Sequence, residues 1–226
     1  MSLGLIIFDC DGVLIDSESL CDRVVSAELT RQGWPLPPAE CHRRFLGLTF
    51  ADIQTAAESH LTRPLGPGWI DHVITQVTTV MAQEVEPIPG ARQALEGTAA
   101  LGLPYRIASN SSRAEMDAKF TRTGLAALIP QDRIHSAYDL IALGKRGKPD
   151  PDLFLDAAAA EGVPPGACVV IEDSLAGIRA AVSAGMICWG YAPEDEGERL
   201  RQAGALPFGS MFAIPSLLRP LLHGSA

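Results

Sequence analysis

The chain has 226 residues, of which 47% are hydrophobic and 20% are charged, and this balance is typical of a soluble globular enzyme. Its net charge of -9 leaves no broad basic surface for a phosphate backbone, so we do not expect a nucleic acid as a partner. Apolar runs are too short to span a membrane, no secretion signal precedes Asp9, and the five scattered cysteines fit a reducing compartment, so we expect a cytoplasmic protein.

The first predicted element is a buried strand over residues 3–8, which is short, apolar and followed by Asp9-Cys10-Asp11-Gly12. The glycine marks a turn, so Asp9 and Asp11 are delivered together at the carboxyl end of this strand. Ligands bind at that end in open α/β sheets. Two unpaired carboxylates repel each other, which indicates a cation or a shared proton between them. Taken alone, the motif is equally compatible with a solvated turn that caps the next helix.

The region that follows, from about residue 16 to about residue 86, is predicted to be helical throughout. Apolar residues recur at helical spacing over 20–27 and again over 70–81. Two shorter helical stretches lie between them, separated by the loop 46–49. The proline-rich segment 86–90 marks the exit from this region. A helical insertion after the first strand of an α/β core predicts a lid.

Strands and helices alternate in the rest of the chain, which implies parallel strands joined by right-handed crossovers. The predicted strands are residues 104–108, 167–171 and 186–191, and the predicted helices are residues 91–101, 113–123, 152–161 and 174–184.

Polar clusters also follow the later strands. Ser109-Asn110-Ser111-Ser112 precedes a helix, where hydroxyls and N–H groups suit an anion, although serine and asparagine are also ordinary helix caps. Glu172-Asp173-Ser174 opens another helix and carries a charge that capping does not need. Lys148 is either a solvated side chain or a cation for a phosphoryl oxygen; Lys145 is weaker because no proline anchors it. Such a set suits Mg²⁺ and phosphoryl transfer.

With these motifs in order, the chain resembles the haloacid dehalogenase superfamily, in its β-phosphoglucomutase-like branch of sugar-phosphate phosphatases and mutases. The resemblance rests on Asp9-Cys10-Asp11-Gly12-Val13-Leu14, Ser109-Asn110, Gly147-Lys148-Pro149-Asp150-Pro151-Asp152 and Glu172-Asp173-Ser174-Leu175-Ala176-Gly177. It implies an α/β fold with a Rossmann-like core, whose parallel sheet is flanked by helices, and a small all-helical cap inserted after the first strand. The implied core is 1–15 and 88–226, and the implied cap is 16–87.

The resemblance also implies a role for individual residues. Asp9 would be the nucleophile that forms an aspartyl-phosphate, and Asp11 would protonate the leaving alcohol and then activate water. Glu172 would be either a ligand of Mg²⁺ or a residue that supports its water ligands. The implied catalytic residues are Asp9, Asp11, Ser109 and Lys148; the substrate-binding residues are Ser109, Asn110, Lys148, Gly47 and Thr49; and the Mg²⁺ ligands are Asp9, Asp11 through its main-chain carbonyl, Asp173 and Glu172.

We therefore expect a Mg²⁺-dependent phosphatase that acts on a small phosphorylated metabolite, a sugar phosphate or sugar-acid phosphate. A sugar phosphomutase is the alternative within the branch. The mutases carry a histidine where this chain has Cys21, and basic residues where it has Leu46 and Phe50, which favours hydrolysis, although Arg43 and Arg44 lie close by. A phosphoacceptor module of the receiver kind is less favoured, because such modules have no helical insertion.

Overall fold

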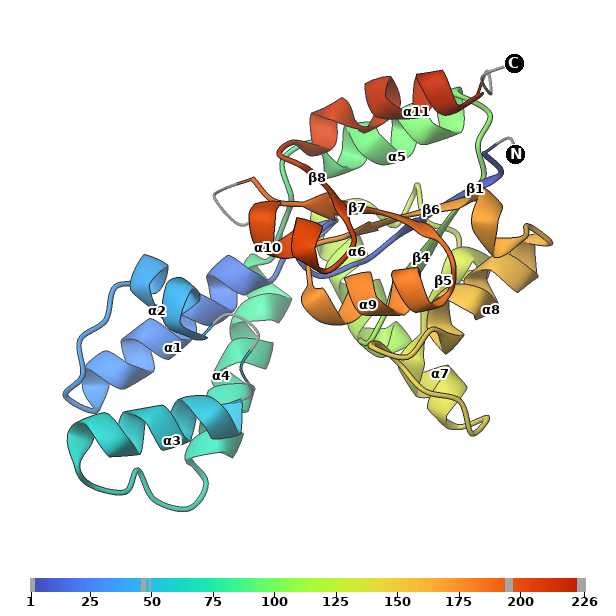
Figure 1. Ribbon diagram of the computed structural model, residues 1–226. Helices are drawn as coiled ribbons and strands as arrows, with labels where there is room; N and C mark the ends of the chain where they lie inside the picture. The colour runs from blue at the N-terminus through green and yellow to red at the C-terminus, as the bar shows by residue number, and fades with distance from the viewer. Residues whose placement is uncertain (1–2, 46–47, 49, 194–196, 223–226) are drawn as a thin grey trace. The chain divides into compact units, whose positions relative to one another are not determined.

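The structure is a computed structural model that describes residues 3–45, 48, 50–193 and 197–222 (Figure 1). The chain divides into two compact units. Met1–Ile15 and Pro87–Ala226 form the first, called the core unit, and Asp16–Glu86 form the second, called the cap unit. The two crossings between the units pair with each other as a small sheet of β2 (Ile15–Asp16) and β3 (Glu86–Pro87).

A six-stranded parallel sheet forms the centre of the core unit. Its strands are β1 (Leu5–Phe8), β4 (Tyr105–Ser109), β5 (Ile134–Ser136), β6 (Cys168–Glu172), β7 (Ile187–Tyr191) and β8 (Leu206–Phe208). Their order is β5-β4-β1-β6-β7-β8, so β1 pairs in parallel with β4 on one side and β6 on the other. This arrangement confirms the predicted α/β fold and brings the carboxyl ends of β1, β4 and β6 to one edge.

Helices cover both faces of this sheet. In the described part of the core unit they are α5 (Ala91–Ala100), α6 (Arg113–Thr123), α7 (Ala137–Ile141), α8 (Asp152–Glu161), α9 (Leu175–Ser183), α10 (Gly197–Gln202) and α11 (Ile214–Leu222), with 3-10 turns η1 (Gln131–Arg133), η2 (Pro165–Ala167) and η3 (Met211–Ala213). Figure 1 shows α5 and α11 on one side of the sheet and α8 and α9 on the other. Within the described ranges, no helix has the length and apolar character that crossing a membrane requires.

The burial of β1 explains its uninterrupted apolar sequence. Leu5 and Ile7 lie in a buried cluster with Phe154 of α8 and Ile178 of α9. Alternate residues of a strand face opposite sides of the sheet, so Ile6 and Phe8, which are also fully buried, face the other side. A strand that is covered on both faces needs apolar residues at every position. The strand that leads to Asp9 is therefore fixed on both faces and along both edges.

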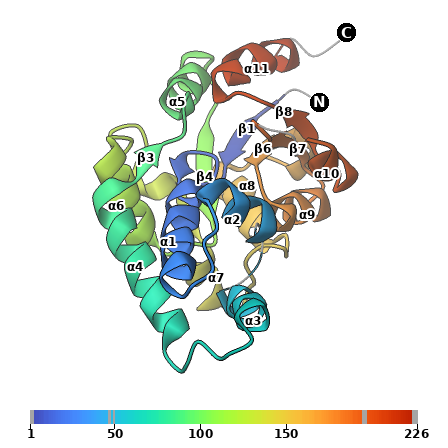
Figure 2. The ribbon, with the colours of Figure 1, turned by 90° about the vertical axis from the view of Figure 1, so that its left-hand side faces the viewer.

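The cap unit is helical, as its periodicity predicts. Its described helices are α1 (Glu18–Arg31), α2 (Pro38–Phe45), α3 (Phe50–Leu61) and α4 (Trp69–Glu84). Figure 2 shows α1 and α4 side by side, and the indole Nε1 of Trp69 on α4 donates a hydrogen bond to Glu28 on α1 at 3.0 Å. Trp34 stacks on His60 with ring centroids 4.2 Å apart. The cap unit thus has an apolar core of its own.

Candidate active site

The chain reverses immediately after β1. The N–H of Asp9 still donates to the carbonyl of Ile171 at 2.9 Å, which continues the pairing of β1 with β6. Gly12 then adopts a φ of +78°, a left-handed conformation that favours glycine. A side chain at this position would also collide with Asp173, because its Cβ would lie 1.8 Å from Asp173 Oδ2. The turn after the first strand therefore depends on glycine for its shape and for the room it leaves.

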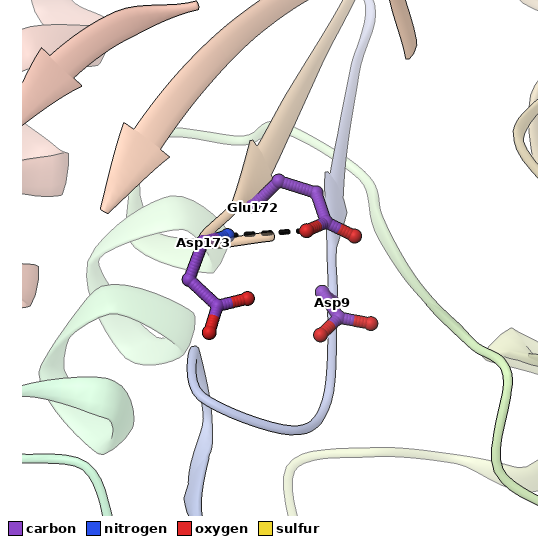
Figure 3. Close-up of side chains that lie close together, drawn as sticks. All are labelled: Asp9, Glu172 and Asp173. Atoms are coloured by element: carbon purple, nitrogen blue, oxygen red, sulfur yellow. Dashed lines mark hydrogen bonds between the residues drawn. The ribbon is translucent and has the colours of Figure 1, made fainter. Parts of the chain in front are cut away.

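Three carboxylates meet at the carboxyl ends of β1 and β6. Figure 3 shows the side chains of Asp9, Glu172 and Asp173 close together. One carboxylate oxygen of each lies within 4.8 Å of the others. Mg²⁺ prefers oxygen ligands and is commonly held by one or two carboxylates together with water and phosphate oxygens. A donor set that consists of carboxylate oxygens alone fits such a cation. Of the four acidic residues that sequence reasoning named as metal ligands, Asp9, Glu172 and Asp173 lie together in this cluster.

Lys148 is the cation that contacts this cluster directly. Its Nζ lies 2.5 Å from Asp9 Oδ1 and 2.5 Å from Glu172 Oε1, and its side chain is only 4% exposed. Burial lowers the pKa of Lys148, but the charges of Asp9 and Glu172 raise it by more, so the net shift is upward and the ammonium group stays charged. Lys148 thereby joins the residue after β1 to the last residue of β6.

Asp9 remains an unusually basic carboxylate despite this partner. Burial raises its pKa to about 7, the charge of Lys148 opposes the rise, and the negative charges of Glu172 and Asp11 add to it. A buried carboxylate with raised pKa lacks sufficient positive charge around it. A divalent cation at the three carboxylates would supply that charge and favour the ionised form.

Glu172 is fully buried and accepts hydrogen bonds at both carboxylate oxygens. Its Oε2 accepts from the N–H groups of Asp173 and Ser174, at 3.1 and 3.0 Å, and from the hydroxyl of Ser174 at 2.9 Å. Ser174 also caps α9 by accepting from the N–H of Gly177 at 3.0 Å. A Cβ at Gly177 would lie 1.8 Å from Glu172 Oε1, so this helix approaches the carboxylate closely only because residue 177 is glycine.

Asn110 holds the loop that carries Lys148. Its Oδ1 accepts from the N–H of Lys148 at 3.0 Å, and its Nδ2 donates to the carbonyl of Lys148 at 3.2 Å. Gly147 makes room for this contact, because a Cβ there would lie 2.6 Å from Asn110 Oδ1. The side chain for which sequence reasoning implies phosphoryl binding thus engages the main chain of Lys148. Ser109, the last residue of β4, is buried, and its hydroxyl accepts from the N–H of Ser111 at 3.0 Å.

Asp11 has a different set of partners: Ser111, which lies in the predicted anion-binding cluster, and Lys119, which sequence reasoning did not name. Lys119 Nζ on α6 lies 2.6 Å from Asp11 Oδ1, and Ser111 Oγ donates to Asp11 Oδ2 at 2.8 Å. The side chain of Lys119 is 14% exposed and that of Asp11 is 29% exposed. Lys119 lies one turn from Met116 and adjoins Phe120, the two buried residues of α6. This position, beside the apolar stripe of the predicted helix 113–123, is the sequence signal that could have identified Lys119 as a site residue.

The remaining predicted residues lie elsewhere. Lys145, the weaker lysine candidate, pairs with Asp156 at 3.4 Å and is 47% exposed. Gly47 and Thr49, the predicted substrate-binding residues of the cap loop, and Leu46 beside them lie outside the described residues. The structure therefore brings together Asp9, Lys148, Glu172 and Asp173, with Asn110 bound to the loop of Lys148, and it gives Asp11 separate partners in Ser111 and Lys119.

Known proteins resemble the chain over nearly its whole length. Residues 3–185 match the family described as haloacid dehalogenase-like hydrolase. A 6-phosphogluconate phosphatase from Escherichia coli is 28% identical over 213 residues, which cover 94% of this chain and 93% of that protein.

Solved structures also resemble this chain over nearly its whole length. A hydrolase from Deinococcus radiodurans, solved with bound phosphate and sodium, has a TM-score of 0.87 and 31% identity, over 97% of this chain and 96% of that one. A putative β-phosphoglucomutase from Thermotoga maritima has a TM-score of 0.77 and 26% identity, over 96% of this chain and 99% of that one.

Proposed function

Because the chain belongs to the haloacid dehalogenase-like hydrolases, we propose that it is a Mg²⁺-dependent phosphatase of a small phosphorylated metabolite, a sugar phosphate or sugar-acid phosphate. The phosphatase from Escherichia coli, named for 6-phosphogluconate, supports both the reaction and the substrate class. The observation that carries the proposal is the contact of Lys148 Nζ with Asp9 Oδ1 at 2.5 Å, beside carboxylates that suit a cation. A nucleophile, a charge for phosphoryl oxygens and a metal-binding group are thereby within reach of one another.

Asp9 is the proposed nucleophile. Its carboxylate oxygen attacks the phosphorus, the bond from phosphorus to the ester oxygen breaks, and an aspartyl-phosphate forms. Water then attacks the same phosphorus, the bond to Asp9 breaks, and inorganic phosphate leaves. Lys148 stays beside Asp9 in both steps and offsets the negative charge of the phosphoryl oxygens.

Asp11 is the proposed acid and base. It gives a proton to the ester oxygen as the alcohol leaves, and it takes a proton from water in the second step. Ser109 is proposed to bind a phosphoryl oxygen through its hydroxyl. Asn110 contributes indirectly to phosphoryl binding by fixing the main chain of Lys148.

Asp9, Asp173 and the main-chain carbonyl of Asp11 are the proposed ligands of Mg²⁺. The hydrogen bonds that Glu172 accepts from Lys148, Asp173 and Ser174 favour its second implied role, as a carboxylate that orients the residues and waters around the cation. When bound, Mg²⁺ withdraws charge from the phosphoryl oxygens and reduces their repulsion by the carboxylates.

The cap unit supports hydrolysis over phosphoryl transfer between two positions of a sugar. Cys21 and Phe50 pack against the apolar core of the cap unit. Burial, with smaller contributions from Asp22 and Glu18, raises the pKa of Cys21 to about 11, so its thiol is neutral near pH 7. Retention of a bisphosphate through a mutase cycle calls for cationic or hydrogen-bonding groups, and neither residue supplies a charge.

A phosphate-release screen tests the proposed reaction. Phosphorylated sugars and sugar acids are incubated with the protein, with Mg²⁺ or with a chelator, and inorganic phosphate is measured. We expect release with Mg²⁺ and none in the chelator. Asp9→Asn should lose turnover with an unchanged circular dichroism spectrum, because an amide of nearly the same shape replaces the nucleophile, whereas Asp71→Asn on the exposed face of α4 should retain it. Substantial turnover by purified Asp9→Asn would exclude the covalent mechanism.

The products from a hexose 1-phosphate distinguish the phosphatase from the mutase. After priming with a hexose bisphosphate, a mutase converts the 1-phosphate to the 6-phosphate with little free phosphate. The phosphatase gives sugar and phosphate, or does not react with this ester. Efficient formation of the 6-phosphate would overturn the phosphatase assignment.

A further inference from the structure

The residue pair with the clearest unassigned role is Lys119 and Asp11. Asp11 lies in the turn after β1, and Lys119 lies 108 residues later on α6. Both oxygens of the Asp11 carboxylate are held, one by the ammonium group of Lys119 at 2.6 Å and one by the hydroxyl of Ser111 at 2.8 Å. The two donors fix the rotation of the carboxylate as well as its position.

The donors are themselves fixed. The carbonyl of Ser111 accepts from Ser136 Oγ at 2.8 Å, and its N–H donates to Ser109 Oγ at 3.0 Å. Lys119 belongs to a helix that begins at a capping box of Ser112 and Glu115 and that buries Met116 and Phe120. Ser111 is therefore hydrogen-bonded to the last residues of β4 and β5, and Lys119 belongs to a capped helix, which is the support that a precisely placed acid–base group requires.

We propose that Lys119 is a positioning residue for Asp11, which it holds, together with Ser111, in the orientation needed to transfer protons during hydrolysis. This inference rests on the proposed phosphatase reaction. Lys119 Nζ forms an ion pair with Asp11, while Lys148 Nζ forms ion pairs with Asp9 and Glu172. The two lysines therefore contact different carboxylates of the site. Lys148 contacts the proposed nucleophile, and Lys119 contacts the proposed acid and base.

The choice of probe separates the two halves of the reaction. p-Nitrophenolate leaves without a proton, so the first half of the reaction with p-nitrophenyl phosphate does not need Asp11. Hydrolysis of the aspartyl-phosphate still needs a base. In Lys119→Met we expect a burst of p-nitrophenolate stoichiometric with the enzyme, followed by slow turnover. With glycerol 2-phosphate, whose alkoxide needs a proton, both halves slow and no burst appears.

Steady-state constants give the expected size of the effect. A misplacement of about 1 Å in a catalytic group lowers turnover by up to about 100-fold, so kcat of Lys119→Met should fall between about tenfold and 100-fold. With p-nitrophenyl phosphate, KM should fall together with kcat, because slow hydrolysis of the aspartyl-phosphate leaves kcat/KM nearly unchanged. Lys119→Arg should recover part of kcat, since guanidinium also donates to a carboxylate. Lys145→Met, a matched change at an exposed lysine, should retain wild-type kcat.

A double-mutant cycle shows whether Lys119 acts through Asp11. In an Asp11→Asn background, Lys119→Met should lower kcat by less than about twofold, because the group that it positions is already gone. An equal loss of kcat in the presence and absence of Asp11 would overturn the proposal and leave Lys119 a residue of structural importance only.

Crystal structures test the inference separately from the proposed reaction. The carboxylate of Asp11 should lie against Lys119 in the wild type and should rotate away in Lys119→Met. An unchanged Asp11 side chain in that variant would overturn the positioning role whether or not the wild type hydrolyses phosphate esters. Absence of wild-type turnover with every ester would instead contradict the proposed function.

Discussion

Glycine at position 177 determines how closely α9 can approach Glu172. Its absent side chain leaves room for a carboxylate that is bound to Lys148 and to the start of α9. Residues that pack this closely against a buried ion pair have no space for a methyl group. Position 177 of the motif therefore requires glycine because a side chain there would occupy the space of the Glu172 carboxylate.

We predict that Gly177→Ala destabilises the protein by about 2 kcal/mol or more and lowers kcat, because the methyl group displaces Glu172 from Lys148. Urea unfolding and phosphate release are the measurements. Gly209→Ala is the control, since a Cβ there would be 3.6 Å from its nearest neighbour, an ordinary contact. Equal unfolding midpoints for the two variants would contradict this account.

We expect His135 to make the stability of the core unit depend on pH. It is buried on β5, with Nδ1 2.8 Å from Asp156 Oδ2 and Nε2 3.1 Å from Arg106 Nη1. Burial lowers the pKa of His135, Asp156 opposes this and the charge of Arg106 reinforces it, so the net shift is downward from 6.5. In the unfolded chain the imidazole binds a proton at a higher pH than in the folded chain. Its contribution to stability is present above pH 6.5 and is lost as the pH falls below that value.

We therefore expect the change in the free energy of unfolding from about pH 8 to about pH 5.5 to be more unfavourable in wild type than in His135→Gln, which cannot titrate. Asp9, whose pKa is raised to about 7, gains stability as the pH falls through that value, but it does so equally in both proteins. Burial raises the pKa of Asp156, but the hydrogen bonds and charges of His135 and Lys145 lower it by more, so the net shift is downward from 3.8. Asp156 therefore titrates in a more acidic range than the two pH values compared. Denaturant titrations at the two pH values measure both quantities. The same loss in wild type and variant would show that His135 has no part in it.

Helix α6 shows how local sequence sets the position of a distant side chain. Ser112 accepts from the N–H of Glu115 at 3.3 Å, and Glu115 Oε2 accepts from the N–H of Ser112 at 2.7 Å, a complete capping box. The box fixes the residue at which the helix begins. It thereby fixes which side chains of α6 lie over the turn after β1, Lys119 among them.

Ser112→Ala should reduce stability by about 1 kcal/mol, because the N–H of Glu115 loses its acceptor. Thermal or urea unfolding measures the loss, and Ser183→Ala at the exposed end of α9 should stay within about 0.5 kcal/mol of wild type. A neutral Ser112→Ala would mean that water replaces the cap fully.

Elements with a strong apolar period could be predicted, and short elements could not. The predicted helices 113–123 and 152–161 have the bounds of α6 and α8, and 174–184 exceeds α9 by one residue at each end. β5 and β8 have three residues each, and neither was predicted. Ile134 belongs to a strand because it pairs opposite Ile107 of β4, which is a property of the folded sheet and not of its own neighbours.

The site could be predicted in part for the same reason. Asp9, Asp11, Ser109 and Glu172 follow or end strands, so the order of motifs was sufficient to name them. Lys119 was missed because its contact with Asp11 depends on the direction of one side chain across 108 residues. Side-chain direction over such separations is set by the packing of whole elements.

Binding of a divalent cation should stabilise the whole molecule. Three clustered carboxylates repel one another in the folded chain and separate on unfolding, so Mg²⁺ should bind the folded form preferentially. At 100 times its dissociation constant, the gain is about 2.7 kcal/mol, or roughly 5 °C or more in Tm. Differential scanning fluorimetry measures the shift, which should be lost in Asp173→Asn and kept in Asp71→Asn. A shift that survives Asp173→Asn would place the cation elsewhere.

The central place of β1 in the sheet has a consequence for biosynthesis. The ribosome makes this strand first, but its two neighbours, β4 and β6, begin only at Tyr105 and Cys168. Until then both edges of an apolar strand are unpaired, a state that favours aggregation. Lys148 follows Asp9 by 139 residues. A nascent chain that ends before β6 therefore lacks the strand and the carboxylates that complete the site around Asp9, and we expect no phosphatase activity from it.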